Sequence, residues 1–321
     1  MTTYLVTGGA GFIGSHLIAH LLKLNHRVIC LDNFNDFYDP KIKESNLKPC
    51  LDDKNFICIK GDIRDQKTLQ DIFNQHSIHT VIHLAAMAGV RPSIENPLLY
   101  EDVNIKGFQV LLETMKDNHI HRLVAASSSS VYGNNEKVPF SETDNVDFAI
   151  SPYAATKKSN EVMAHVYHKL NHLSVVMLRF FTVYGPGQRP DLAIHKFTKL
   201  IDHHQPIPFF GDGSTQRDYT YIDDIIQGVI ASIHYVAQQE VYEIINLGEA
   251  TPIDLKTMVS TIEDALGKKA QLEYQPMQPG DVKITYADIS KAKRLLNYQP
   301  HTDFKTGIEA FVKWYKDFYH A

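Results

Sequence analysis

The sequence contains little cysteine and tryptophan. Its 321 residues include three cysteines and one tryptophan. The odd number of cysteines and their irregular spacing argue against a disulfide framework and do not match a zinc site. Cys30 and Cys58 lie in apolar runs, so we expect both to be buried free thiols. The 17 histidines are scattered without a metal-like grouping, and no metal is expected.

Excess positive charge and long apolar runs are also missing. The formal net charge is −5 and the isoelectric point is near 6.4, which gives no support for nucleic-acid binding. No apolar run approaches the ~18 residues that a membrane span needs. The chain enters a strand directly, without the charged start and apolar core of a signal peptide. We therefore expect a soluble cytoplasmic enzyme, and an anionic substrate would need a local cluster of positive charge.

The first half of the chain alternates short β-branched runs with longer helical patterns. This order is typical of an α/β fold with a doubly wound parallel sheet, the Rossmann arrangement. We expect a NAD-binding domain over residues 1–180, to which residues 222–250 return, with Val241–Leu247 as a further strand. Residues 181–221 and 251–321 are expected to form a smaller, interwoven domain for the substrate. The expected strands and helices of the first half are 4–6, 12–23, 28–31, 42–47, 56–59, 68–75, 81–84, 99–117, 123–126, 153–171 and 175–178.

A glycine-rich turn lies between the first strand and the first helix. Gly8, Gly11 and Gly14 allow a tight turn, close approach of the backbone to a pyrophosphate, and close packing of helix on strand. The free N–H groups at the helix start favour phosphate there. A plain turn is the alternative, but the strand before it and the helix after it both favour dinucleotide binding.

An acidic residue ends the second expected strand. Asp32 is placed to bind a ribose 2′-hydroxyl and would repel a 2′-phosphate, which favours NAD over NADP. It could instead cap the following loop, and Asp62 could either lie near the adenine or cap a helix. The small residues after the fourth strand would lie along the cofactor. The residues expected to contact NAD are Gly8, Gly11, Phe12, Ile13, Gly14, Asp32, Asn33, Asp62, Ile63, Leu84, Ala85, Ala86, Asn104, Tyr153 and Lys157.

Hydroxyl groups and a Tyr-Lys pair predict hydride-transfer chemistry. The run Ser127–Ser130 follows a strand of the expected sheet, and Tyr153 and Lys157 share one face of a long helix. A neighbouring ammonium and an oxidised nicotinamide would favour the phenolate of Tyr153, which could then act as a base. Taken alone, such a pair is more often a feature of a solvated helix, and a serine run is more often a loop.

These motifs resemble those of the extended short-chain dehydrogenase/reductase family. The resemblance covers essentially the whole chain and includes the run Arg217–Asp224. It implies that Tyr153 is the base, that Lys157 holds the nicotinamide ribose, and that Ser128 is the bridging hydroxyl. Members that catalyse 4,6-dehydration or decarboxylation carry carboxylates beside this hydroxyl, where this chain has Ser129 and Ser130. Epimerisation at carbon 4, through a transient 4-keto sugar and bound NADH, needs neither carboxylate.

Within this family the chain is most similar to the UDP-glucuronate 4-epimerases. The runs that carry the similarity are 31–38, 88–91, 179–186 and 189–191. This group implies that Ser129, Ser130, Thr182 and Arg189 contact the substrate carboxylate. Oxidation of carbon 4 makes a β-keto acid, and hydrogen bonds could hold its carboxylate away from the alignment that releases CO2. A solvated loop charge is the alternative for Arg189.

The UDP group would bind in the C-terminal half. Arg217 is the best candidate for the diphosphate, with Tyr219 beside it. Asp281 could hold a ribose hydroxyl. Many galactose 4-epimerases have an arginine three residues before the aspartate that matches Asp281, where this chain has Gln278. Arg91 is a possible substitute for that diphosphate contact. Phe209 or Phe210 could pack on uracil, although each ring alone is more typical of a core.

Three other functions stay open on the sequence alone. A 4-epimerase of neutral UDP-hexoses would not use Arg189, and a NAD-linked dehydrogenase would accumulate NADH. A nucleotide-binding regulatory protein would have no need of Ser128, Tyr153 and Lys157 together. The helices expected at 99–117 and 153–171 have apolar residues on more than one side, including Val103, Leu111, Met115, Val162 and Val166. The family resemblance implies a homodimer through these helices.

Overall fold

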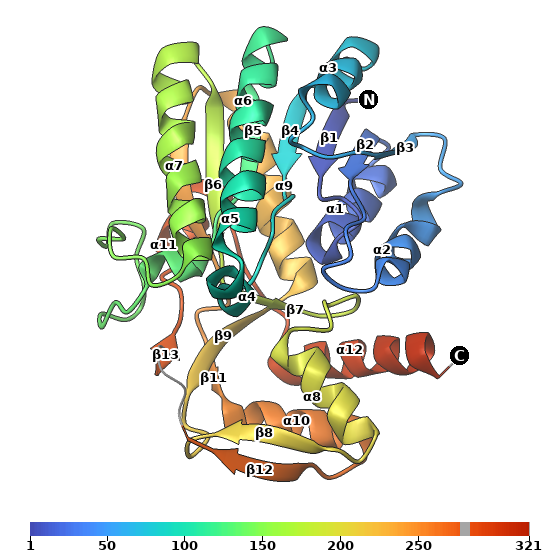
Figure 1. The fold of residues 1–321 in the computed structure, drawn as a ribbon, viewed down its shortest axis with the longest axis vertical. Helices are drawn as coiled ribbons and strands as arrows, with labels where there is room; N and C mark the ends of the chain where they lie inside the picture. The colour runs from blue at the N-terminus through green and yellow to red at the C-terminus, as the bar shows by residue number, and fades with distance from the viewer. Residues whose placement is uncertain (277–282, 321) are drawn as a thin grey trace.

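The structure is a computed structural model that describes residues 1–276 and 283–320. A seven-stranded parallel sheet forms the upper part of the molecule in Figure 1, with strand order β10-β6-β5-β4-β1-β2-β3. The predicted α/β fold class is therefore confirmed. Its strands are β1 (Thr3–Thr7), β2 (Arg27–Asp32), β3 (Phe56–Lys60), β4 (Thr80–His83), β5 (Arg122–Ala126), β6 (Ser174–Phe180) and β10 (Tyr242–Leu247).

Helices cover both faces of this sheet. Helices α1 (Phe12–Lys23) and α9 (Ile222–Gln238) pack together on one face, while α3 (Gln66–Gln75), α6 (Gly107–Asp117) and α7 (Pro152–Asn171) lie on the other. Each face has its own apolar core, because alternate residues of the buried strands point to opposite sides. Helices α2 (Pro40–Leu47) and α11 (Ser290–Leu296) add to the first face.

The expected helix 99–117 is built from three pieces. Helix α5 (Pro97–Tyr100) leads into a π-helical segment at Glu101–Lys106, and α6 continues it. Wider π-type turns recur at functional sites. Asn104 lies in this segment, and its position matters for the cavity described below. A short helix that the sequence did not suggest, α4 (Val90–Glu95), precedes α5.

The lower part of Figure 1 has its own small core. Strand β9 (Gln216–Tyr221) pairs with β7 (Thr182–Tyr184), β11 (Pro252–Asp254) and β13 (Ile284–Thr285). Strand β8 (Pro206–Phe210) pairs with β12 (Gln271–Gln275), and a turn at Gly211–Gly213 follows β8 with positive φ at both glycines. Apolar residues of α8 (Ala193–Asp202), α10 (Leu255–Leu266) and α12 (Phe304–Tyr319) fill the core beneath these strands.

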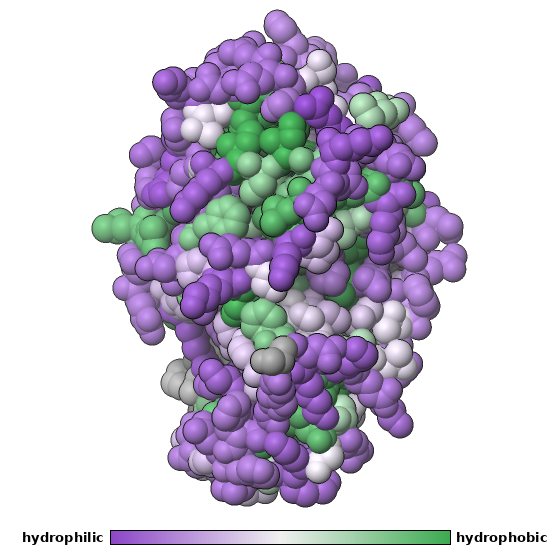
Figure 2. All heavy atoms as spheres, turned by 90° about the vertical axis from the view of Figure 1, so that its right-hand side faces the viewer, coloured by the Kyte–Doolittle hydropathy of each residue, from purple (hydrophilic) through white to green (hydrophobic). Residues whose placement is uncertain are grey.

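One expectation about the cysteines is wrong. Cys30 is buried in β2, but Cys58 is exposed. The reason is that β3 is the last strand at its edge of the sheet and is less covered by helices than β2. No helix in residues 1–276 and 283–320 is long and apolar enough to cross a membrane. Polar side chains cover most of the face shown in Figure 2, and the apolar groups form separate areas on it.

Candidate active site

A cavity of about 370 Å³ lies at the carboxyl ends of the central strands. This is the edge of an open α/β sheet at which ligands bind, because the strand order reverses there. The cavity begins at the glycine turn after β1 and reaches the segments after β5 and β6. It therefore gathers residues that are up to 184 positions apart in the chain, from Gly8 to Leu192.

Most of the residues that the sequence selected line this cavity. Those that do are Gly8, Gly11, Phe12, Ile13, Gly14, Asp32, Asn33, Asp62, Ile63, Leu84, Ala85, Ala86, Ser128, Ser129, Ser130, Tyr153, Lys157, Thr182 and Arg189. The others that the structure describes, Asn104, Arg91, Phe209, Arg217 and Tyr219, are not among the lining residues. Asp281 and Gln278 lie outside the described residues.

The glycine turn is too tightly packed for side chains. A Cβ atom on Gly8 would lie 2.6 Å from the backbone nitrogen of Ala85, and one on Gly14 would lie 2.4 Å from the carbonyl oxygen of Gly8. Gly11 is the residue before the first turn of α1, and no side chain caps the N–H groups of that turn. The turn therefore presents free donors to the cavity, as phosphate binding at a helix start requires.

Two acidic residues, Asp32 and Asp62, line the cavity near the glycine turn. Asp32 accepts hydrogen bonds from the backbone of Ala10 (3.1 Å) and Phe34 (2.9 Å), so it caps the loop and lines the cavity at once. Asp62 is not a helix cap, because Asp65 caps α3. Asp62 instead receives the amide of Asn33 at 2.9 Å and the guanidinium of Arg64, which holds the pKa of its carboxyl well below the usual range.

Asn104 supports the wall of the cavity from behind. Its amide oxygen accepts from the backbone N–H of Met87 at 2.8 Å, and its amide nitrogen donates to the Met87 carbonyl at 2.9 Å. The same nitrogen donates to Thr156 at 3.1 Å. The side chain is 1% exposed, so these bonds fix the backbone after β4 against α7.

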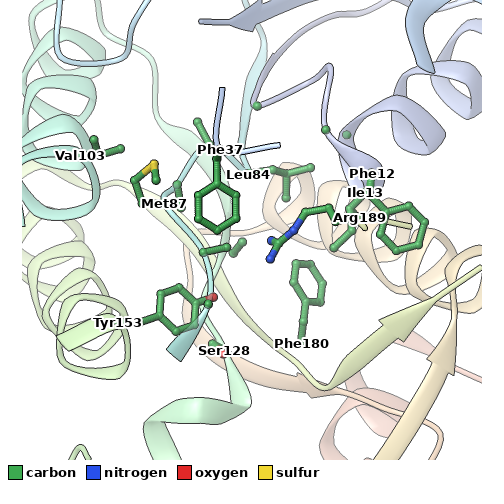
Figure 3. A pocket seen from close by; sticks show the side chains of 18 of the residues that line it. Phe12, Ile13, Phe37, Leu84, Met87, Val103, Ser128, Tyr153, Phe180 and Arg189 are labelled. Atoms are coloured by element: carbon green, nitrogen blue, oxygen red, sulfur yellow. The ribbon is translucent and has the colours of Figure 1, made fainter. Parts of the chain in front are cut away.

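Tyr153 and Lys157 come from the first two turns of α7. The helix begins where the sequence favours it, because Ser151 accepts a hydrogen bond from the backbone of Ala154 at 3.1 Å and Pro152 occupies the first turn. Lys157 is buried, and its Nζ atom donates to the carbonyl oxygen of Ala126 at 2.8 Å. Tyr153 and Ser128 point toward one another (Figure 3).

The pKa shifts of Tyr153 and Lys157 only partly match the expectation of a phenolate at Tyr153. Burial raises the pKa of Tyr153, against a hydrogen bond from Ser128 and the charge of Arg189. Burial lowers the pKa of Lys157 to about 8, against the charge of Glu161. Lys157 alone therefore does not produce a phenolate, because desolvation disfavours both charged forms. A further positive charge in the cavity would favour the phenolate of Tyr153.

A buried ion pair beneath Lys157 was not predicted. Glu161 receives the guanidinium of Arg179 through two hydrogen bonds of 2.8 and 2.9 Å, and Ser127 donates to it at 2.6 Å. Both charged side chains are 1% exposed. The four-residue spacing from Lys157 to Glu161 could have suggested that they share a helix face. The pairing of α7 with β6 could not be read from the sequence.

Arg189 reaches the cavity from the loop before α8. Its guanidinium points into the cavity near Phe37 and Phe180 (Figure 3). Burial opposes its charge, but the hydrogen bonds and charge of Asp191 outweigh this effect and keep its pKa above the ordinary value. Ser129, Ser130 and Thr182 line the same cavity. Of the remaining expected ligands, Phe209 and Tyr219 are buried in the lower core. Arg91 lies over the ring of Phe210 at 5.9 Å, and Arg217 donates to Gln216.

Several lining residues were missed as candidate ligands, mainly from the loop after β2 and from α2. Lys43 is 5% exposed and lies 4.9 Å above the ring of Tyr38, and it donates to Asn35. A lysine in a short polar helix looks like a surface residue, so its pattern gave no signal. The other missed residues include Asn35, Phe37, Tyr38, Met87, Phe180 and Leu192.

Comparison with known proteins agrees with this geometry. The family model described as GDP-mannose 4,6 dehydratase matches residues 5–311. A UDP-glucuronate 4-epimerase of Thermodesulfobacterium geofontis is 47% identical over 318 residues, which cover 99% of this chain and 97% of that protein.

Solved structures show the same likeness. The crystal structure of a UDP-glucuronic acid 4-epimerase from Bacillus cereus, in complex with UDP-glucuronic acid and NAD, has a TM-score of 0.91 and 39% identity. The match covers 99% of this chain and all of the Bacillus cereus chain. A UDP-glucose 4-epimerase of Thermotoga maritima with UDP-glucose has a TM-score of 0.89 at 30% identity, covering 98% and 99% of the two chains. This chain belongs to the extended short-chain dehydrogenase/reductase family of nucleotide-sugar enzymes matched by that model.

Proposed function

We propose that this protein is a NAD-dependent UDP-glucuronate 4-epimerase, which interconverts UDP-glucuronic acid and UDP-galacturonic acid. The observation that carries the proposal is that Arg189 enters the same cavity as Tyr153 and Lys157, together with Ser129, Ser130 and Thr182. A cation and three hydroxyls beside a Tyr-Lys pair match a substrate with a carboxylate next to the reacting carbon. The relatives from Thermodesulfobacterium geofontis and Bacillus cereus are UDP-glucuronate 4-epimerases.

The residues of the first half fit a dinucleotide. The glycine turn and the start of α1 would hold the pyrophosphate, and Asp32 would accept from the adenosine ribose. Asp62 and Asn33 close the adenine end, and Ala85 and Ala86 line the path toward Tyr153. A bound NAD would supply the acceptor for the hydride of carbon 4 of the sugar and a further positive charge beside Tyr153.

Tyr153, Lys157 and Ser128 would handle the proton. The phenolate of Tyr153 removes the proton of the 4-hydroxyl while Ser128 donates a hydrogen bond that orients this oxygen. Lys157, held at the Ala126 carbonyl, supplies a positive field and a contact for the nicotinamide ribose. After the ketosugar turns over in the cavity, Tyr153 returns the proton to the oxygen of the inverted alcohol.

Arg189 and the hydroxyls would protect the ketosugar. The carboxylate at carbon 6 is lost as CO2 most readily when its bond to carbon 5 stands perpendicular to the carbon-4 carbonyl. Hydrogen bonds from Arg189, Ser129 and Thr182 would hold the carboxylate in another orientation. The carboxylate pair that a 4,6-dehydratase would use is absent from this chain, because Ser129 and Ser130 occupy those positions.

The UDP group would extend toward the lower part of the molecule. Arg217 on β9 and Arg91 on α4 remain the proposed diphosphate ligands. Phe210 replaces Phe209 as the proposed uracil contact, because Phe209 is 3% exposed and packs on Tyr274 at 5.4 Å between ring centroids. Tyr219 is likewise buried, and its proposed role becomes the support of Arg217.

A 4-epimerase of neutral UDP-hexoses is the second candidate. The likeness to the Thermotoga maritima enzyme favours it, because the same fold acts there on UDP-glucose. Proton NMR of the purified protein with UDP-glucuronic acid, beside UDP-glucose and UDP-N-acetylglucosamine, separates the two. Galacturonate anomeric signals without accumulating NADH or pentose establish the first function. Turnover of a neutral sugar alone establishes the second.

We also propose a two-domain homodimer. Residues 1–180 and 222–250 would form the NAD domain, and residues 181–221 and 251–321 the substrate domain.

The proposed dimer surface lies on α7. Val103, Leu111 and Met115 are buried, whereas Val162 and Val166 on α7 are exposed, as is Leu170 one turn further on. Such an apolar stripe suits a second copy. Analytical ultracentrifugation of Val166→Glu against the unaltered protein tests this surface.

All three cysteines are free, which is consistent with our proposal of a cytoplasmic location.

A further inference from the structure

Arg189 already has a carboxylate partner within its own loop. Its Nε atom donates to Oδ1 of Asp191 at 2.9 Å, and its Nη2 atom donates to Oδ2 at 2.7 Å. The side chain of Arg189 is 19% exposed and that of Asp191 is 36% exposed. Asp191 is not among the residues that line the cavity, so it holds the guanidinium from outside the cavity.

This geometry leaves one edge of the guanidinium free for a second carboxylate. Arginine has five N–H donors in a rigid fork. Asp191 uses the side edge, with one N–H of Nε and one of Nη2. The end edge keeps one N–H of Nη1 and the second of Nη2, and it can bind another carboxylate through two parallel hydrogen bonds. Asp191 does not have to leave when such a ligand binds.

Phe37 contacts the same guanidinium. Cζ of Arg189 lies over its ring, 5.5 Å from the centroid. Phe37 belongs to the loop after β2, and its backbone N–H donates to the side chain of Asn35 at 3.2 Å. The guanidinium is thus held at one edge by its own loop and contacted by a segment about 150 residues earlier in the chain. These two contacts determine where the free edge points.

We propose that Asp191 is a positioning residue for substrate specificity. It aims the free edge of Arg189 at a carboxylate on carbon 6 of the sugar, without contacting the sugar itself. This inference rests on the proposed function and deepens it. Its consequence is kinetic, since a guanidinium that is free to turn would still attract a uronate but would not hold its carboxylate in one orientation.

Loss of this orientation opens a defined side reaction. In the 4-keto uronate the bond between carbon 5 and carbon 6 breaks and CO2 leaves. The electron pair passes to carbon 5, where the carbon-4 carbonyl stabilises it as an enolate. A proton from water then gives the 4-ketopentose. The fraction of turnovers that ends as pentose therefore measures how well the carboxylate is held.

The test compares Asp191→Asn, Asp191→Glu and Arg189→Ala with the unaltered protein. Proton NMR measures the ratio of pentose to galacturonate products, and kcat/KM is compared for UDP-glucuronic acid and UDP-glucose. Asp191→Asn should raise the pentose ratio about ten-fold and lower the preference for the uronate about ten-fold. Arg189→Ala sets the upper limit of both effects. Asp191→Glu, which keeps both carboxylate oxygens, should restore most of each value.

Both readouts are ratios, so a smaller fraction of folded protein does not change them. Asp53→Asn is the control, because Asp53 likewise accepts a hydrogen bond from a residue two positions away, the backbone N–H of Asn55, and does not line the cavity. An unchanged product ratio and preference in Asp191→Asn would overturn the inference and leave the proposed function standing. Failure of the unaltered protein to convert UDP-glucuronic acid would instead remove the proposed function and this inference with it.

Discussion

The Nζ atom of Lys157 lies 5.9 Å from the ring centroid of Tyr153, one helical turn earlier on α7. The ammonium donates to the Ala126 carbonyl, so it is held in place by the sheet and not by the phenol. The two side chains are therefore neighbours on α7 whose positions are fixed separately.

Tyr153→Phe removes the group that we propose takes the proton of the substrate. We expect kcat to fall by a factor of about 10² to 10⁴, with binding of UDP-glucuronic acid nearly unchanged. NMR turnover and isothermal titration calorimetry measure the two effects. Tyr100→Phe is the matched control, because this ring lies 6.3 Å from Tyr153 but its hydroxyl donates to Ala88. Equal loss of turnover in the two variants would argue against Tyr153 as the base.

The pH profile should reveal the buried lysine. The pKa of Lys157 is lowered to about 8 by burial, and the oxidised nicotinamide adds another positive charge nearby. The ammonium is lost as pH rises through this pKa, so kcat/KM should fall on the alkaline side at or below about pH 8. Glu161→Gln removes the charge that opposes this shift, so the fall should move to lower pH. A profile that is flat to pH 10 contradicts this role for Lys157.

The pair of Glu161 and Arg179 should matter greatly for stability. Arg179→Met leaves the carboxylate of Glu161 buried without its partner, which costs about 3–5 kcal/mol of unfolding free energy. Urea denaturation measures this loss. Lys313→Met breaks an exposed pair with Asp317 and should cost less than about 1 kcal/mol. The double variant Glu161→Met with Arg179→Met should recover part of the loss, and no recovery would mean that packing dominates.

The glycine turn can be tested through Gly14. A Cβ atom there would meet the backbone of Gly8 and Gly9 at 2.4 and 2.7 Å, so Gly14→Ala should cost about 1–3 kcal/mol and weaken NAD binding. Gly267→Ala is the control, since its Cβ has nothing within 4 Å and only its positive φ causes strain, worth about 1 kcal/mol. Thermal unfolding with and without NAD compares them. Equal shifts in the two variants would contradict the close packing.

The local features of the chain were readable from the sequence alone. Strand and helix bounds in the first half follow the apolar periodicity, and α1 begins and ends at the residues expected. The glycine turn, Asp32 and the Tyr153 and Lys157 pair could be found because each motif acts over a few residues of backbone. The resemblance of the whole chain to a known enzyme family then suggested a chemical role for each of these residues.

Contacts between distant segments were decided only by the tertiary structure. Phe37 and Arg189 meet because two loops leave the same edge of the sheet, and Arg179 meets Glu161 because β6 packs under α7. The same packing buried Phe209 and Tyr219 and exposed Cys58. Periodicity reports which side of an element is apolar, but it carries no information on which distant element covers that side. Residue types and local turns therefore determined the fold and the pair of Tyr153 and Lys157, while packing determined how Arg189 is held.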